Sequence, residues 1–167
     1  ISLHGSSLLA VDRIHDGLGR GDESESANEA AAKWNRDSRW FDDGDWYVGG
    51  YWEPGAGHWD GKSGKYRNAD ITHVGVTPVF RLIWQDSLAN GVKPFVEAGI
   101  GLHQMSEDRI GDKGLGGEFT FANQIGVGAR FAGQHEVSVH IQHYSNADMY
   151  DSNPGFDFGT IRYGYNF

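Results

Sequence analysis

The alternation of apolar and polar residues in the C-terminal two thirds of this chain constrains its fold more than any other feature. In residues 136–142, Val137, Val139 and Ile141 alternate with Ser138, His140 and Gln142. A period of two places successive side chains on opposite faces of an extended strand. No run reaches the roughly 18 apolar residues that a transmembrane helix needs. The sequence therefore predicts an all-β protein.

Other segments repeat this pattern or are rich in aromatic residues. The clearest are Thr72–Trp84, which contains Pro78, then Lys93–His103, Phe119–Phe131 and Thr160–Phe167. We also expect strands at Trp46–Trp59, Asn28–Trp40 and Ser2–Arg13. Residues 22–27 are interpreted as an exposed loop, and a helical turn at residues 29–33 is an alternative to a strand there.

Apolar residues on one face and polar residues on the other are typical of a membrane β-barrel. The 25 Gly, nine Phe, seven Tyr and six Trp suit a narrow barrel with aromatic girdles. A tilted strand needs about 9–11 residues to cross the bilayer, so eight strands fit a chain of this length. We predict an eight-stranded antiparallel transmembrane β-barrel, with residues 1–167 forming one domain. Glu97, Arg130 and Arg162 are expected to face inward and to pair with one another.

Composition excludes several classes of function. The chain has no Cys, which rules out disulfides and thiolate chemistry, and its net charge of -9 argues against a nucleic-acid partner. The histidines show no zinc-ligand spacing, so we expect neither a metal nor a cofactor. The chain opens at Ile1 without a leader pattern and closes on Phe167. We therefore expect an exported, mature outer-membrane protein.

The residues with catalytic potential lie on the face expected to meet lipid. The parity of residues 137–141 continues to His143 and Ser145, and counting back by twos from Phe167 brings Asp157 to the same outer face. Polar groups are costly in hydrocarbon, so such residues are functional candidates by default. If residues 148–156 join the two strands as a hairpin, the three side chains lie near one another.

These residue types can perform ester hydrolysis. His143 would take the Ser145 hydroxyl proton, Ser145 would attack the carbonyl carbon, and Asp157 would orient the imidazole. Asn146 and the backbone N–H groups of Ala147 and Asp148 are the candidate oxyanion donors. The alternative interpretation is that all three side chains are polar rim residues beside a solvated loop.

A family resemblance bears on that choice. Residues 143–147 (His-Tyr-Ser-Asn-Ala), 93–101 and 50–52 are similar to the PagL family, and the likeness runs from roughly Trp46 to the C-terminus. The resemblance implies an eight-stranded outer-membrane barrel that uses a Ser-His-acid triad and no metal. The implied substrate is the ester-linked 3-hydroxyacyl chain at position 3 of lipid A, part of lipopolysaccharide. The site would face the outer leaflet.

Two departures from the family pattern affect the roles that the resemblance implies. The family acid is commonly Glu, so Asp157 has a shorter reach and Asp151 is the substitute candidate. Gly commonly stands where this chain has Asp148, which bears on the oxyanion backbone. An outer-membrane phospholipase and a non-enzymatic barrel with an adhesive or structural role remain alternatives, and a homodimer is left open.

Overall fold

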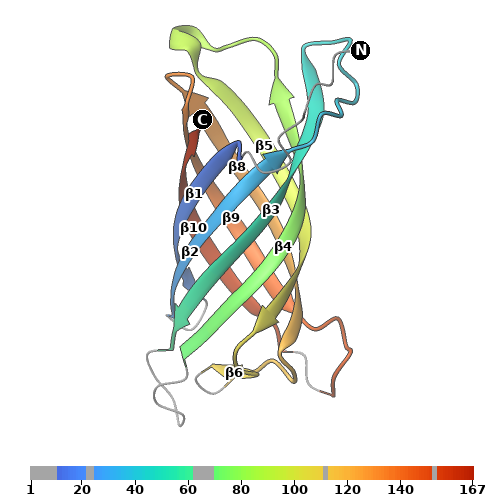
Figure 1. The fold of residues 1–167 in the computed structure, drawn as a ribbon, viewed down its shortest axis with the longest axis vertical. Helices are drawn as coiled ribbons and strands as arrows, with labels where there is room; N and C mark the ends of the chain where they lie inside the picture. The colour runs from blue at the N-terminus through green and yellow to red at the C-terminus, as the bar shows by residue number, and fades with distance from the viewer. Residues whose placement is uncertain (1–10, 22–24, 62–69, 111–112, 152–153) are drawn as a thin grey trace, which may run out of the picture.

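Eight long strands form a closed antiparallel barrel in the computed structural model, which describes residues 11–21, 25–61, 70–110, 113–151 and 154–167 (Figure 1). The barrel strands are β1 (Arg13–Gly21), β2 (Ser26–Asn35), β3 (Trp46–Asp60), β4 (Asp70–Trp84), β5 (Lys93–Met105), β8 (Phe119–Phe131), β9 (His135–Ser145) and β10 (Phe156–Asn166). Each strand pairs with its neighbour along the barrel, and β1 closes the ring against β10, from Arg13 opposite Asn166 to Gly21 opposite Phe158. The predicted eight-stranded antiparallel barrel is confirmed.

Three short elements lie in the connections between barrel strands. A 3-10 turn, η1 (Ala89–Gly91), lies between β4 and β5, and the strands β6 (Arg109–Ile110) and β7 (Lys113–Gly114) form a hairpin between β5 and β8. The start of β1 and the end of β10 lie at one end of the barrel, which we call the periplasmic end. The β6–β7 hairpin and the β9–β10 loop lie at the opposite, extracellular end (Figure 1).

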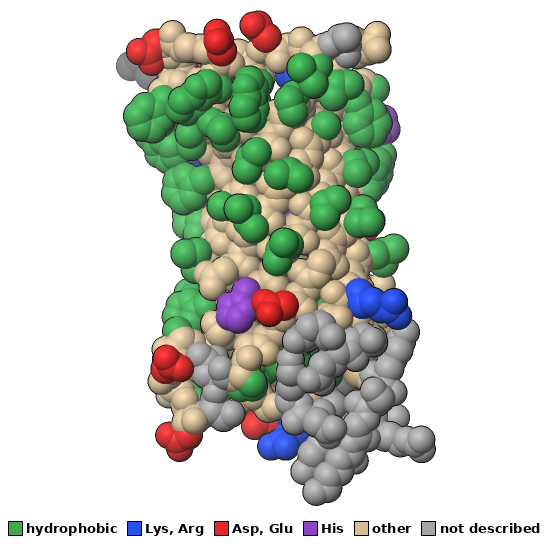
Figure 2. Space-filling model, turned by 180° about the vertical axis from the view of Figure 1, so that it is seen from behind, with side chains coloured by type: hydrophobic (Ala, Val, Ile, Leu, Met, Phe, Trp, Pro, Cys, Tyr) green, Lys and Arg blue, Asp and Glu red, His purple; other side chains and the backbone are tan. Residues whose placement is uncertain are grey.

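The outer wall of the barrel is apolar, as the alternation predicts. Its exposed side chains include Leu18, Val74, Ile100, Ile125, Val127, Val139, Ile141 and Ile161. Figure 2 shows hydrophobic side chains spread over the barrel wall, with most charged side chains towards its two ends. No helix in the described part of the chain has the length and hydrophobicity needed to cross a bilayer. This arrangement of apolar wall and strand length is that of a membrane-spanning barrel.

The inside of the barrel is filled with paired charges. Arg81 bonds Glu97 and also Glu136, with N–O distances of 2.6 and 2.8 Å. Arg162 pairs with Glu29 and Glu53, at 3.2 and 3.5 Å. The prediction that inward charges pair is confirmed, but the partners differ. Glu97 pairs with Arg81 and His140 rather than with Arg130 or Arg162. The stagger between strands determines which inward side chains lie at the same height along the barrel axis.

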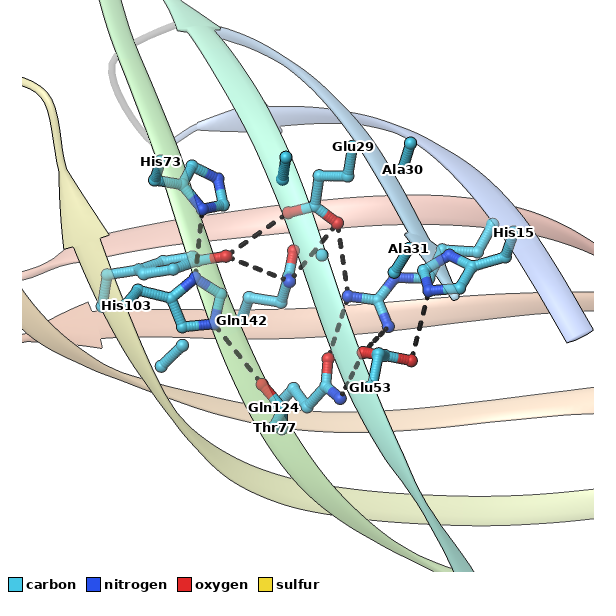
Figure 3. A pocket seen from close by; sticks show the side chains of 15 residues that line it. His15, Glu29, Ala30, Ala31, Glu53, His73, Thr77, His103, Gln124 and Gln142 are labelled. Atoms are coloured by element: carbon cyan, nitrogen blue, oxygen red, sulfur yellow. Dashed lines mark hydrogen bonds and ion pairs between the residues drawn. The ribbon is translucent and has the colours of Figure 1, made fainter. Parts of the chain in front are cut away.

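A polar layer follows these charges towards the extracellular end. His15, His73, His103 and Gln142 are among the side chains around a small cavity (Figure 3). The Nδ1 atoms of His73 and His103 lie 3.0 Å apart. The cavity measures about 30 Å³, which is about the volume of one water molecule. The barrel interior therefore has no room for a lipid chain at this level.

Apolar side chains fill the extracellular end of the interior. This extracellular cluster comprises Ala27, Trp59, Ile71, Met105, Ile110, Leu115, Ala122, Tyr144, Phe156 and Phe158. Ile110 belongs to the β6–β7 hairpin and Leu115 follows it directly, and both are almost fully buried. The hairpin therefore closes the extracellular end by packing on side chains from the barrel strands.

The N-terminal third is where the sequence predictions were least accurate. The first described strand is Arg13–Gly21. Of the strand predicted at Ser2–Arg13, residues 2–10 lie outside the described part of the chain, residues 11 and 12 are not in a strand, and only Arg13 is. The second strand covers Ser26–Asn35 instead of Asn28–Trp40, and no helical turn forms at residues 29–33. Ser26 and Ala27 belong to that strand rather than to a loop. Four small residues in Ala27–Ala32 weaken the hydrophobic alternation, which explains the shifted boundaries.

Pro54 and Pro78 each lie inside a strand and interrupt one of its two ladders. Pro78 pairs in register with Trp52 of β3, but the ladder between β4 and β5 is interrupted at Thr77 and Pro78. Pro54 of β3 interrupts the ladder with β2 in the same way. Proline has no N–H to donate, so each ring removes one ladder bond while the other neighbouring strand keeps the register.

Candidate active site

His143 and Asp157 face each other across the β9–β10 ladder on the outer wall. His143 Nδ1 lies 2.8 Å from Asp157 Oδ1, and the two side chains are 45% and 62% exposed. A carboxylate bonded to Nδ1 favours the tautomer with its proton there and leaves Nε2 free to accept a proton. This is the arrangement that a general base needs.

Ser145 lies two residues beyond His143 on the same side of β9 and is half-buried. Residues i and i+2 of a strand are about 6.6 Å apart and share a face, so the hydroxyl and the imidazole are neighbours. Within the described part of the chain no hydrogen bond joins them. Catalytic hydrogen bonds of free enzymes are often long and tighten when substrate binds.

The turn after Ser145 contains the candidate oxyanion donors. Met149 N–H donates to the Asn146 carbonyl at 3.1 Å, and Ala147 and Asp148 between them have φ values of 51° and 60°. Positive φ at both central residues is characteristic of a type I′ turn. The Asn146 side chain is fully buried and donates from Nδ2 to the Leu115 carbonyl at 2.7 Å. That bond ties the turn to the chain segment beside β7.

The extracellular cluster fixes the backbone that carries the three residues. Tyr144, between His143 and Ser145, points inward, and its ring lies 4.7 Å from that of Trp59. Phe156 and Phe158 flank Asp157 and also pack on Trp59, with ring centroids 6.1 and 4.5 Å away. The sequence analysis did not predict that Trp59 supports the two strands. The alternation of residues does place Tyr144, Phe156 and Phe158 on the inward face.

Asn123 is a second residue that the sequence analysis missed. It pairs with His143 across the β8–β9 ladder and with Ile100 on its other side, and it is exposed. His143 is thus flanked by Asp157 on one strand and Asn123 on the other. The sequence could have revealed it, because Asn123 is a polar residue on the otherwise apolar outer face of its strand, between Phe121 and Ile125.

Candidate metal ligands lie elsewhere on the outer wall. In the described part of the chain His58, Asp60 and Asp70 can bring one ligand atom each within 4.8 Å of one another. They lie at the extracellular ends of β3 and β4, and Asp60 and Asp70 face each other in the ladder. Exposed acidic groups are common on solvated rims. None of these three residues is among those assigned to the Ser145 site.

The closed barrel and its apolar wall define a membrane β-barrel, and the paired His143 and Asp157 give it an ionisable site on its outer wall. The family model described as lipid A 3-O-deacylase (PagL) matches residues 27–166. The chain therefore belongs to the PagL family. It is an outer-membrane enzyme that hydrolyses ester bonds.

Individual relatives agree with this assignment. The chain is 31% identical to lipid A deacylase PagL of Pseudomonas aeruginosa over 162 residues, which is 97% of this chain and 90% of that protein. It is 30% identical to lipid A deacylase PagL of Bordetella bronchiseptica over 115 residues, covering 69% of this chain and 61% of the relative. The crystal structure of the outer-membrane enzyme PagL matches with a TM-score of 0.83 and 29% identity, over 93% of this chain and 99% of that one.

Proposed function

We propose that this enzyme removes the ester-linked 3-hydroxyacyl chain from position 3 of lipid A with a triad of Ser145, His143 and Asp157. His143 Nε2 takes the proton of the Ser145 hydroxyl as Oγ attacks the ester carbonyl carbon. The tetrahedral intermediate collapses, and the sugar oxygen leaves with the proton from His143. Water, activated by the same imidazole, then releases the fatty acid and restores the Ser145 hydroxyl.

The observation that carries this proposal is the 2.8 Å bond between His143 Nδ1 and Asp157 Oδ1 on the outer wall. A paired histidine and carboxylate beside a serine are the working parts of acyl transfer. The cross-strand position of Asp157 supports it over Asp151 as the acid, because Asp157 lies directly opposite His143.

The oxyanion is assigned to the turn that follows Ser145. The N–H groups of Ala147 and Asp148 are the proposed donors, since backbone donors in a tight turn are fixed before the reaction begins. Asn146 has an indirect part, because the bond of its side chain to the Leu115 carbonyl holds the turn against the extracellular end. The Nδ2 group has two N–H bonds, and one of them makes that contact.

Access from the bilayer fits the same picture. The interior cavity of about 30 Å³ holds about one water, so an acyl chain must approach from outside the barrel. The triad lies at the extracellular ends of β9 and β10, and the outer leaflet there contains lipopolysaccharide. The proposed site lies within one barrel domain, and a homodimer stays an open alternative.

The test is mass spectrometry of lipid A incubated in detergent with the wild-type enzyme and with Ser145→Ala. We expect wild type to release one 3-hydroxy fatty acid and Ser145→Ala to release none above background. Ser138→Ala is the matched control, because Ser138 lies on the same strand but is buried inside the barrel. Release by Ser145→Ala at the wild-type rate would refute the triad. Release of fatty acid from glycerophospholipid alone would instead identify a phospholipase.

A further inference from the structure

Gly155 lies against the His143 ring just before β10 begins. It is buried and has a φ of 67°. A Cβ added to Gly155 would lie 2.7 Å from His143 Cε1 and 3.3 Å from His143 Nε2, whereas real Cβ atoms essentially never come within 3.0 Å of another heavy atom. The imidazole therefore occupies the space that a side chain at this position would fill.

Backbone conformation alone does not account for this contact. Gly91 and Gly133 both have a φ of 75°, yet a Cβ added to either would meet nothing within 4 Å. Those two glycines satisfy only the left-handed backbone of a turn. Gly155 meets a second requirement, which is space for the edge of the ring that carries Nε2.

The ring has few other restraints. It lies on the outer wall, where it is 45% exposed, while the side chains of the extracellular cluster pack on the opposite side of β9. Asp157 restrains it at Nδ1, and Gly155 borders it at Cε1 and Nε2. Contacts at both edges leave the imidazole a narrow range of orientations.

We propose that Gly155 is a positioning residue for His143. Because Gly155 has no side chain, the Cε1–Nε2 edge of the ring can lie against its Cα, a contact that we call the seat. The seat keeps Nε2 directed towards the Ser145 hydroxyl. This inference rests on the proposed function, in which Nε2 takes the Ser145 proton. A methyl group on Gly155 would push the ring out of the seat, and the ring would then lose either Asp157 or Ser145.

The experiment compares Gly155→Ala with Gly133→Ala in the full-length enzyme folded in detergent micelles. Both substitutions put Cβ on a left-handed residue and carry a similar backbone cost, so Gly133→Ala controls for strain. A misplacement of about 1 Å can lower a rate by about 100-fold. We expect kcat for lipid A to fall by about 10- to 100-fold in Gly155→Ala with KM within about twofold. Gly133→Ala should match wild type.

A spectroscopic measurement reports the ring independently of turnover. In enzyme labelled with ¹³Cε1-histidine, the His143 signal is identified by its disappearance in His143→Asn. We expect this signal to move in Gly155→Ala and to stay in place in Gly133→Ala. An unmoved signal, a kcat equal to that of Gly133→Ala, or a loss confined to KM would each overturn the positioning role.

The same set of variants separates this inference from the proposed function. If His143→Asn deacylates lipid A at the wild-type rate, the triad itself is refuted, and the positioning role falls with it even if the ring signal moves. If His143→Asn is inactive while Gly155→Ala is as active as Gly133→Ala, the triad stands and only the role of Gly155 is refuted.

Discussion

His143 is the residue on which the proposed chemistry depends, and its environment is unlike that of the buried histidines. His15, His73, His103 and His140 are buried inside the barrel. His143 instead lies on the outer wall between Asn123 and Asp157 of the neighbouring strands, and among the described residues its one carboxylate partner is Asp157. In lipid this bond would be stronger than in water, because a low dielectric strengthens charge-assisted hydrogen bonds.

Replacing the acid tests this arrangement at the level of one residue. We expect Asp157→Asn to lower kcat by about 10²- to 10⁴-fold, because an amide neither orients nor stabilises the protonated imidazole as a carboxylate does. Asp157→Glu should stay within about tenfold of wild type, since it keeps the charge and adds reach. Initial rates of fatty-acid release are the measurement. Asp151→Asn is the control, and an inactive Asp151→Asn beside an active Asp157→Asn would reverse the assignment.

At the level of elements, successive residues of the β9–β10 hairpin face opposite sides of the barrel wall, so its two faces have different functions. Its outward positions carry the candidate catalytic residues, and its inward positions carry Tyr144, Phe156 and Phe158. All three inward rings pack on Trp59, which comes from β3 on another part of the barrel. A packed aromatic cluster behind the hairpin keeps the spacing between the two strands from varying.

Trp59 should therefore affect both stability and rate. We expect Trp59→Leu to lower the free energy of unfolding by about 2–4 kcal/mol, because it leaves a cavity among the aromatic rings. The kcat of the folded fraction should also fall, as β9 and β10 lose a common support. Urea unfolding in detergent and deacylation rates measure the two effects. Trp84→Leu, on the exposed outer wall, is the control. It should leave kcat unchanged and should change the free energy of unfolding by no more than about 1 kcal/mol.

The whole molecule has an apolar outer wall and an interior of paired charges that the apolar extracellular cluster closes at one end. The single carboxylate of Glu136 accepts hydrogen bonds from three arginines near the periplasmic end, Arg13, Arg81 and Arg130. The candidate site is at the other end of the same strand. The paired charges and the extracellular cluster occupy the barrel interior, which supports the proposed site on the outer wall.

Stability and catalysis should accordingly be separable. We expect Glu136→Gln to lower the free energy of unfolding by about 3–5 kcal/mol, because it leaves buried guanidinium groups without their shared carboxylate. The kcat of the molecules that remain folded should equal that of wild type. Unfolding in detergent and rates per folded molecule are the measurements. Glu118→Gln is the control, since Glu118 is exposed and should shift stability by no more than about 0.5 kcal/mol. Equal stability of the two variants would contradict the role given to the interior ion pairs.

The sequence by itself determined the fold class and the outward positions of His143, Ser145 and Asp157. Both follow from the two-residue period of a strand, which is a local property that needs no knowledge of neighbouring strands. The same rule failed where small residues obscure the pattern, at β1 and β2.

Only the tertiary structure decided which residues meet across strands. The pairing of Asp157 with His143, the contacts of Trp59 with three inward rings, and the partners of Glu97 all depend on register and stagger around a closed barrel. The seat at Gly155 is of the same kind, since a glycine in a loop gives no sign of the ring beside it. Long-range register arises from the closure of all eight strands together, and no single segment of the chain contains it.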